Sequence, residues 1–392
     1  MIVDAGAADL AAQVWVSAEA AGLRRRAPGD TAPVLGAGND DLRSGRAYLT
    51  AMGRWAVAAW PEAHGGLGLE GEDVAVVQRA LGELAVPDLY PFAVGLALVG
   101  PTLLVHGSAD QQDRWLAPIA RGEAIWCQLF SEPDAGSDLA GLTTRAERDG
   151  DVWRVSGAKV WASRAHYADR GLLLARTDWS VPKHAGITVF GLNLRSAGVE
   201  VAPLVQLNGD AHFNQVFLDE VEVPDADRIG EPGAGWGIAR SVLALERGGG
   251  AGAPAAGLGL GDPTALLDHL RATGRLDDPV AQDRAMRLLS AAKTRQWAGR
   301  GAPGAKLALA DGLKVSSGLA LEASGPAGML ADGEWATTFL TAPSLSIRGG
   351  TDEIQRNQLG ERALGLPREP SVDRDVPFAD LPRSGRPTGE RP

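Results

Sequence analysis

The sequence lacks the features that mark disulfide-rich proteins, membrane proteins and proteins with a signal peptide. It has one cysteine, Cys127, among 392 residues, which excludes a framework of disulfides within the chain and fits a reducing compartment. No apolar run is long enough to span a bilayer, and the first residues lack the basic segment of a signal peptide. We therefore expect a soluble, cytoplasmic protein that does not act in a membrane.

Basic charge and metal-ligating clusters are also scarce. The 38 Lys and Arg residues are outnumbered by 49 Asp and Glu residues, which gives a formal net charge of −11. No basic run is longer than residues 24–26, so neither nucleic acid nor an anionic membrane surface is an expected partner. The six histidines have no metal-ligand spacing and the single cysteine cannot complete one, so no metal site is predicted.

Composition changes along the chain and divides it into zones. Residues 1–124 are Ala-rich and helical in pattern, residues 125–228 hold short apolar runs between turn signals, and residues 229–366 are again helical. The tail at 367–392 is rich in proline and charge and poor in apolar residues, so we expect it to be disordered or extended over a neighbour. The fold class is therefore α+β, with a β-domain between helical domains.

The stretch 126–163 carries the residues best suited to chemistry. An apolar run at 126–130 breaks into Ser-Glu-Pro-Asp-Ala-Gly-Ser-Asp at 131–138, whose turn-forming residues cannot continue a strand. Two short strands are predicted after it, at 152–155 and 159–161. We expect this hairpin to bring Trp161 and Ser163 to the loop, so that hydroxyls, backbone N–H groups and an indole face one site. An ordinary hairpin with a polar loop is the alternative.

These motifs resemble those of a known family. SEPDAGSD at 131–138, followed by GAKVWAS at 157–163, resembles the flavin-binding centre of the acyl-CoA dehydrogenases, and WPEAHGGLGLEG at 60–71 resembles another of their loops. The resemblance implies an N-terminal helical domain, a middle β-barrel or sandwich and a C-terminal four-helix bundle. It also implies FAD as cofactor, an acyl thioester on CoA or a carrier protein as substrate, and electron-transfer flavoprotein or another acceptor. The expected assembly is a homotetramer or dimer, or a heterotetramer.

The resemblance assigns contacts residue by residue. Ser137 matches a serine that touches the pantetheine or pyrophosphate part of the thioester, and Arg247 is placed with it as substrate-binding. The residues assigned to the cofactor are Gln128, Phe130, Ser131, Trp161, Ser163, Gly325, Gly328, Thr351 and Glu353.

The general base is predicted from the helical pattern and the resemblance together. Glu246 falls on the apolar stripe that Trp236 and Leu243 form, where either desolvation raises the pKa of its carboxyl or an arginine pairs with it. The pattern alone favours the paired, structural interpretation. Most family members carry the base just before a Gly-Thr pair, where this chain has Gly349, but isovaleryl-type members carry it in an LxLER segment that matches 243–247. We therefore predict Glu246 as the base and the backbone N–H of Gly349 as a donor to the thioester oxygen.

A second departure from the family concerns the flavin pyrophosphate. Family members usually have an arginine closely followed by Phe-Gly, and residues 262–300 contain no such segment. This resembles subunits of mixed α2β2 complexes, in which not every site holds flavin. Two alternatives therefore remain: a non-catalytic or half-site partner subunit of a heteromeric acyl-CoA dehydrogenase, and a flavin monooxygenase or oxidase on the same fold.

Overall fold

The structure is a computed structural model that describes residues 6–27, 41–248, 263–298, 304–331, 333–368, 370 and 373–382. It divides into two compact units, one within Met1–Val205, Ala211–Pro254 and Ser371–Pro392, the other within Gln206–Asp210 and Ala255–Pro370. Each unit packs around a hydrophobic core of its own.

The first unit begins with helices. They are α1 (Ala7–Ala20), α2 (Leu42–Ala56), α3 (Gly71–Gly82), α4 (Tyr90–Val94), α5 (Gly100–His106) and α6 (Ala109–Ala120). A π-helical turn, Gly95–Val99, joins α4 to α5. Helix α6 begins at a capping box, in which the Ser108 hydroxyl accepts a hydrogen bond from the Gln111 N–H while the Gln111 side chain accepts one from the Ser108 N–H.

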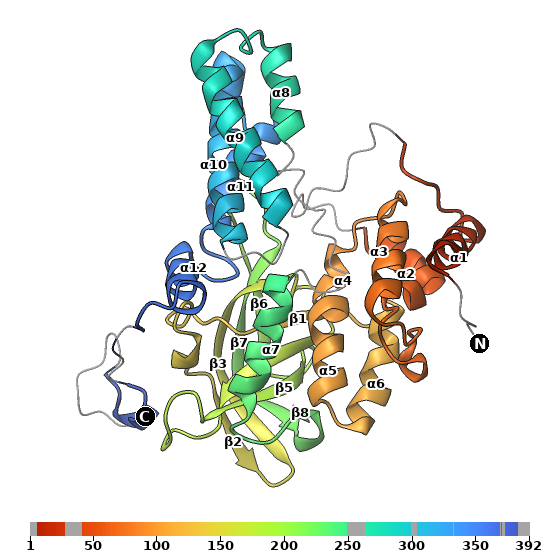
Figure 1. Cartoon of the computed structure of the whole chain (residues 1–392). Helices are drawn as coiled ribbons and strands as arrows, with labels where there is room; N and C mark the ends of the chain where they lie inside the picture. The colour runs from red at the N-terminus through yellow and green to blue at the C-terminus, as the bar shows by residue number, and fades with distance from the viewer. Residues whose placement is uncertain are drawn as a thin grey trace. The chain divides into compact units, whose positions relative to one another are not determined.

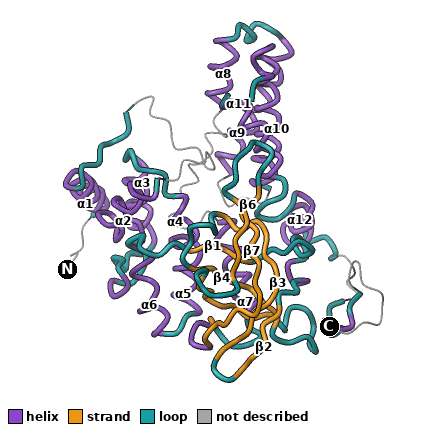
Figure 2. The backbone as a smooth tube through the Cα atoms, turned by 180° about the vertical axis from the view of Figure 1, so that it is seen from behind, coloured by secondary structure: helices purple, strands orange, loops and turns teal. Residues whose placement is uncertain are grey.

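A mixed sheet follows the helices in the same unit. Its strands are β1 (Trp126–Leu129), β2 (Arg145–Asp149), β3 (Val152–Ser163), β4 (Arg170–Arg176), β5 (Ile187–Asn193), β6 (Val199–Leu204), β7 (Phe213–Pro224) and β8 (Arg228–Ile229). The strand order is β6-β7-β3-β2-β4-β5-β8, and β1 runs parallel to β4. The strands are drawn in orange in Figure 2. Strand β3 is continuous where the sequence predicts two short strands, with a register shift between Val155 and Gly157.

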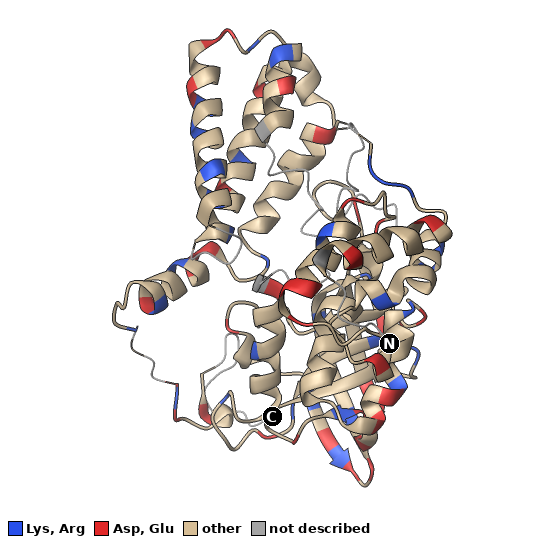
Figure 3. Cartoon of the chain, turned by 45° about the vertical axis from the view of Figure 1, so that its right-hand side comes forward, with Lys and Arg blue, Asp and Glu red and all other residues tan. Residues whose placement is uncertain are grey.

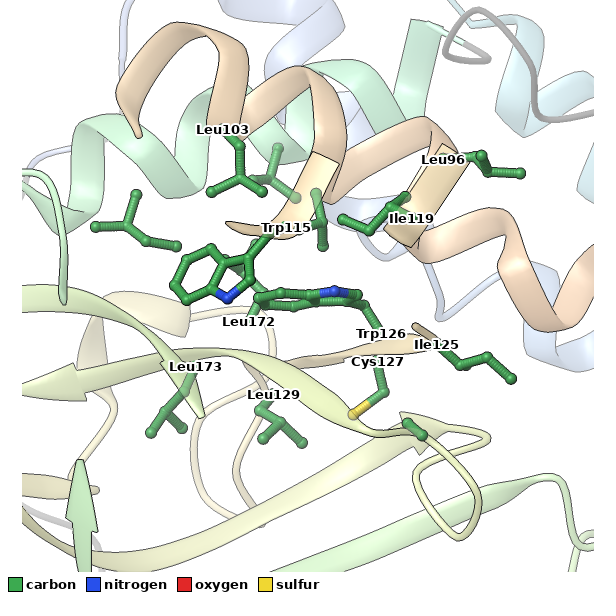
Figure 4. Close-up of a cluster of buried hydrophobic side chains, with 14 of the residues drawn as sticks. Leu96, Leu103, Trp115, Ile119, Ile125, Trp126, Cys127, Leu129, Leu172 and Leu173 are labelled. Atoms are coloured by element: carbon green, nitrogen blue, oxygen red, sulfur yellow. The ribbon is translucent and has the colours of Figure 1, made fainter. Parts of the chain in front are cut away.

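The helices and the sheet share one core. The indoles of Trp115 in α6 and Trp126 in β1 meet edge to face, with ring centroids 5.3 Å apart (Figure 4). Gly191 in β5 makes room for both rings, since a Cβ there would lie 2.7 Å from the Trp115 ring. Because Trp126 is 1% exposed and begins β1, this packing fixes the strand that leads into the 131–138 loop.

Helix α7 (Gly235–Gly248) completes the first unit. It packs along β5, and a Cβ on Gly235 would lie 2.6 Å from the carbonyl oxygen of Ile187, so only glycine allows this close approach. The helix groups with the sheet. The predicted boundary at residue 229 instead placed it with the C-terminal helices.

Part of the C-terminal tail also belongs to the first unit. Phe378 is buried, its N–H donates to the carbonyl of Val181, and the N–H of Ala379 donates to that of Trp179, both at 2.9 Å. Residues 373–382 thus have a defined place against the first unit, while the prediction of a disordered or extended tail for 367–392 as a whole stays a prediction. A buried aromatic ring and backbone hydrogen bonds therefore hold this segment against the first unit.

The second unit is helical. Its helices are α8 (Pro263–Ala272), α9 (Pro279–Ala298), α10 (Ala305–Ala323), α11 (Glu334–Leu345) and α12 (Asp352–Gln358). Helices α8 to α11 pack side by side (Figure 1), which confirms the predicted C-terminal four-helix bundle. Its core is made of small and aliphatic side chains such as Leu266, Leu270 and Ala320.

Acidic and basic residues are interspersed along the helices and the hairpins (Figure 3). Among the helices of the described ranges, none combines the length and the apolar character that crossing a membrane requires.

Candidate active site

The 131–138 loop is a tight turn tied to strand β3. Glu132 and Ala135 exchange backbone hydrogen bonds, each of 3.1 Å. The Ser131 carbonyl accepts a hydrogen bond of 2.9 Å from the N–H of Val160, the residue before Trp161. The structure therefore brings the loop and the GAKVWAS segment together, as the sequence predicted.

A buried ion pair holds the loop from inside. Lys159 is fully buried and its Nζ donates to Glu132 Oε1 at 2.8 Å and to the Phe130 carbonyl at 3.1 Å. The Glu132 carboxylate also accepts backbone N–H groups from Thr143 at 2.7 Å and Thr144 at 2.9 Å. A buried charge with a partner and further hydrogen bonds is the arrangement that a folded interior tolerates. The pair joins the two motif segments.

The pair affects the pKa of both groups. Burial alone would raise the pKa of Glu132, but the charge and hydrogen bond of Lys159, with the Thr144 and Thr143 donors, hold it below its usual value. Burial lowers the pKa of Lys159, and Glu132 opposes that shift. The glutamate therefore stays ionised at neutral pH and serves as an anchor rather than as a proton acceptor.

Strand β3 presents Trp161 in an unusual way. The β3–β7 register shifts between Lys159 and Ala162, and at this bulge Trp161 has a φ of 61°. Its side chain is 58% exposed and lies edge to face with the Phe213 ring, at 5.9 Å between ring centroids. A left-handed backbone costs a non-glycine residue about 1–2 kcal/mol. Strain at a large exposed aromatic is typical of a functional site.

The other residues of the first unit that were assigned to the cofactor differ in exposure. Gln128 in β1 and Ser163 at the end of β3 are half-buried, as is Ser131. Phe130 is 3% exposed, so its ring belongs to the core, while its carbonyl bonds Lys159. The partly exposed polar side chains leave amide and hydroxyl groups for a ligand.

The predicted base is placed differently from the expectation. Among the described residues of α7, the buried ones are Gly235, Ile238, Ala239 and Val242, whereas Glu246, in the last turn of the helix, is exposed. The apolar stripe therefore ends before Glu246, and desolvation of its carboxyl does not follow from the helix alone. The side chain of Arg247 lies outside the described part of the chain.

In the second unit, the 349–353 segment is an ordered turn into α12. Gly349 and Gly350 have φ values of 66° and 88°, which glycine adopts without strain. The Thr351 hydroxyl caps α12 by accepting a hydrogen bond of 3.2 Å from the Ile354 N–H. Glu353 is exposed in the first turn of α12.

Lysines on α10 support this turn. Lys306 Nζ donates to the Gly350 carbonyl at 2.8 Å and to Asp352 at 3.2 Å. Lys314 lies 3.8 Å from the same carboxylate and 2.9 Å from the Ser346 hydroxyl. Asp352 is buried, so these cations and the backbone set the shape in which Gly349 presents its N–H.

The Gly325–Met329 turn has a structural reason for one of its glycines. A Cβ on Gly328 would lie 2.3 Å from the carbonyl oxygen of Leu321, so packing against α10 already requires glycine there. Gly325 has a φ of 57° and open space around it. Its backbone can therefore be approached by a ligand.

Sequence reasoning missed Glu132, Lys159 and the lysines under Asp352. The available signal was Lys159, which follows Trp153 and Val155 on the inward face of a strand, where a cation needs an acidic partner. Among the described residues, no group of three or more His, Cys, Asp and Glu could hold a metal ion.

Models of the three acyl-CoA dehydrogenase domains match the chain. The N-terminal domain matches residues 38–123, the middle domain residues 127–221 and the C-terminal domain residues 274–364. Acyl-CoA dehydrogenase IpdE1 of Mycobacterium tuberculosis is 37% identical over 357 residues, which cover 83% of this chain and 87% of that protein.

Solved structures give the same result. "Tcur3481-Tcur3483 steroid ACAD" is 26% identical with a TM-score of 0.71, over 93% of this chain and 97% of that one. The ChsE4-ChsE5 complex of Mycobacterium tuberculosis is 27% identical with a TM-score of 0.67, over the same shares of the two chains. The chain therefore belongs to the acyl-CoA dehydrogenase family of oxidoreductases.

Proposed function

We propose that this protein is an FAD-dependent dehydrogenase that converts an acyl thioester, on CoA or on an acyl-carrier protein, to its α,β-unsaturated form. The observation that carries the proposal is Trp161, whose exposed indole is held in a left-handed conformation next to the Ser131 loop. An apolar ring kept in water at a strained position favours a planar ligand that covers it. Membership of the family supports the same function.

The polar groups around the indole fit FAD. Gln128 offers a side-chain amide, and Ser131 and Ser163 offer hydroxyls on either side of the bulge. In the second unit we assign Gly325, Gly328, Thr351 and Glu353 to the cofactor as well. When bound, FAD supplies the acceptor for the hydride that leaves the β-carbon of the thioester.

Glu246 is the proposed general base for the α-proton. An α-C–H is a weak acid, so the thioester oxygen must receive hydrogen bonds as negative charge develops on it. The backbone N–H of Gly349 is the proposed protein donor. This role needs no side chain, and the left-handed turn at Gly349 suits glycine.

Ser137 and Arg247 are the proposed contacts of the thioester's carrier. Ser137 is exposed in the loop, where its hydroxyl can bond a pantetheine or pyrophosphate group. Electron-transfer flavoprotein is the proposed electron acceptor. Burial raises the pKa of the Cys127 thiol to about 12, so this cysteine is unreactive. We assign the protein to the cytoplasm, because a chain with a single cysteine fits a reducing compartment.

A second candidate is a half-site partner subunit of a heteromeric acyl-CoA dehydrogenase. Two similar structures carry double names, Tcur3481-Tcur3483 and ChsE4-ChsE5, and the latter is called a complex. Residues 262–300 also lack the arginine and Phe-Gly segment that reaches the flavin pyrophosphate in the family. The first candidate fits a homotetramer or dimer, and the second fits a heterotetramer.

Flavin content separates these candidates. Protein purified alone that is yellow and has flavin absorbance supports the complete enzyme. Colourless protein that gains flavin only with a second chain supports the half-site subunit.

The Glu246→Gln variant tests the proposed base. It should keep its flavin but lose the bleaching of flavin absorbance by an acyl thioester under anaerobic conditions. The matched control is Glu231→Gln, which changes an exposed carboxylate just before the same helix and should bleach normally. Unchanged bleaching in Glu246→Gln would remove Glu246 from the mechanism.

A further inference from the structure

Residues 373–382 lie against residues 179–182, and Phe378–Asp380 form a short 3-10 helix. Pro377 pairs with Pro182 in an antiparallel bridge, and the Phe378 and Ala379 N–H groups donate to Val181 and Trp179. The ring of Phe378 is 4% exposed and lies 5.4 Å from that of Trp179. Backbone bonds and one buried aromatic side chain together make this a specific docking contact.

Phe378 covers a buried cation that holds the residues after the 131–138 loop. Its ring centroid lies 3.5 Å from the guanidinium carbon of Arg176, which is fully buried. The same guanidinium donates to the carbonyls of Ala140 at 2.6 Å, Leu142 at 3.1 Å and Lys183 at 3.0 Å. The Phe378 ring of the tail therefore covers one face of the Arg176 guanidinium, and this guanidinium holds the chain at Ala140 and Leu142, just beyond the loop.

Lys183 makes a second link between the tail and the loop. Its Nζ donates to both carboxylate oxygens of Asp138, at 2.9 Å and 3.0 Å, and pairs with Asp373 of the tail. Its side chain is only 11% exposed. Burial lowers the pKa of Lys183, but hydrogen bonds to Asp373 and Asp138 more than offset this and keep its pKa above the usual value.

The two ends of the loop thus have different anchors. The Glu132 end is fixed by Lys159 within the core of the sheet. The Asp138 end, next to the exposed Ser137, is held by Lys183, whose other partner is in the tail. A change in the tail is therefore expected to reach the Asp138 end and not the Glu132 end.

We propose that residues 373–382 are a strap that positions the Ser137–Asp138 end of the loop, with Asp373 and Lys183 as positioning residues. The proposal rests on the proposed function in one respect, namely that Ser137 contacts the thioester. Loss of the strap then weakens thioester binding and leaves the chemical step unchanged, because Glu246 and the Trp161 bulge are not held by it.

Amide hydrogen exchange of the full chain tests the strap without relying on activity. In Asp373→Asn, exchange across 136–142 should become several-fold faster, while exchange across 126–130 stays as in the unmodified protein. Asp380→Asn is the matched control, since it removes an exposed carboxylate from the same segment and should change neither range. Asp373→Glu should restore slow exchange.

Phe378→Ala provides a second variant that acts through Arg176 and not through charge. It should also speed exchange across 136–142. The strap would be overturned if exchange across 136–142 were no faster in Asp373→Asn and Phe378→Ala than in Asp380→Asn.

Steady-state kinetics then separate positioning from a general loss of structure. Asp373→Asn should raise the KM for an acyl-CoA several-fold with kcat unchanged, and Asp373→Glu should return KM toward its original value. A fall in kcat with unchanged KM would contradict positioning. If the proposed function is wrong, no acyl thioester will reduce the flavin of the unmodified protein. The hydrogen-exchange test of the strap does not depend on that result.

Discussion

The Lys159→Met variant tests whether a buried ion pair holds the candidate flavin loop. Lys159 is fully buried with its Nζ 2.8 Å from Glu132. Methionine has a similar length and no charge, so the variant removes the cation without opening a large cavity. Glu132 would keep its hydrogen bonds from Thr143 and Thr144 but lose its counter-charge. Because the carboxylate is 5% exposed, water cannot replace the lysine.

Removing one partner of a buried pair costs about 3–5 kcal/mol of the free energy of unfolding, since a charge remains uncompensated. Arg154→Met is the matched control: it removes a cation from the same strand, 40% exposed and paired with Asp149 and Glu222. Exposed pairs contribute about 1 kcal/mol or less. Urea unfolding followed by tryptophan fluorescence measures both variants. Equal losses of unfolding free energy in Lys159→Met and Arg154→Met would refute the reasoning. So would a double variant, Lys159→Met with Glu132→Gln, that is no more stable than Lys159→Met alone.

Three further outcomes follow from the site. Because the pKa of Glu132 is lowered on folding, its contribution to stability is complete above the ordinary pKa of 4.5 and is lost as pH falls through the folded pKa. The difference in free energy of unfolding between the unmodified protein and Glu132→Gln should therefore shrink in acid, and a difference that does not change with pH contradicts this. Trp161→Asn should weaken FAD binding by about 0.5–1.5 kcal/mol in flavin titrations, yet change the free energy of unfolding by only about 0.5 kcal/mol. Asp352→Asn should destabilise the second unit by about 1–3 kcal/mol, whereas the exposed Glu353→Gln should leave its thermal midpoint unchanged.

Features set by neighbouring residues could be predicted from the sequence. The Asp149-Gly150 turn separates β2 from β3 because Gly150, with a φ of 65°, accepts the left-handed turn conformation. The break after Leu129 follows from the turn-forming residues of the loop. The four-helix bundle was predicted from the family resemblance, since helical spacing alone does not say which helices pack together.

Features set by distant contacts could not be predicted. Glu132 and Lys159 are 27 residues apart, and nothing in their local sequence names the partner. Phe378 docks on Arg176 from a segment whose composition is typical of disorder. Glu246 lies on the predicted stripe, but it is exposed, and Val242 is the last fully buried residue among the described side chains of α7. In each case a tertiary contact decides the outcome.

Anaerobic titration of the isolated, flavin-containing protein with a panel of saturated acyl thioesters tests the central claim most directly. The panel should vary in chain length and branching and should present each acyl group on CoA and on an acyl-carrier protein. We expect at least one thioester to bleach the flavin absorbance with formation of its α,β-unsaturated product, and Glu246→Gln to abolish this. Flavin that stays oxidised with every thioester, or is reduced equally well by Glu246→Gln, would contradict it.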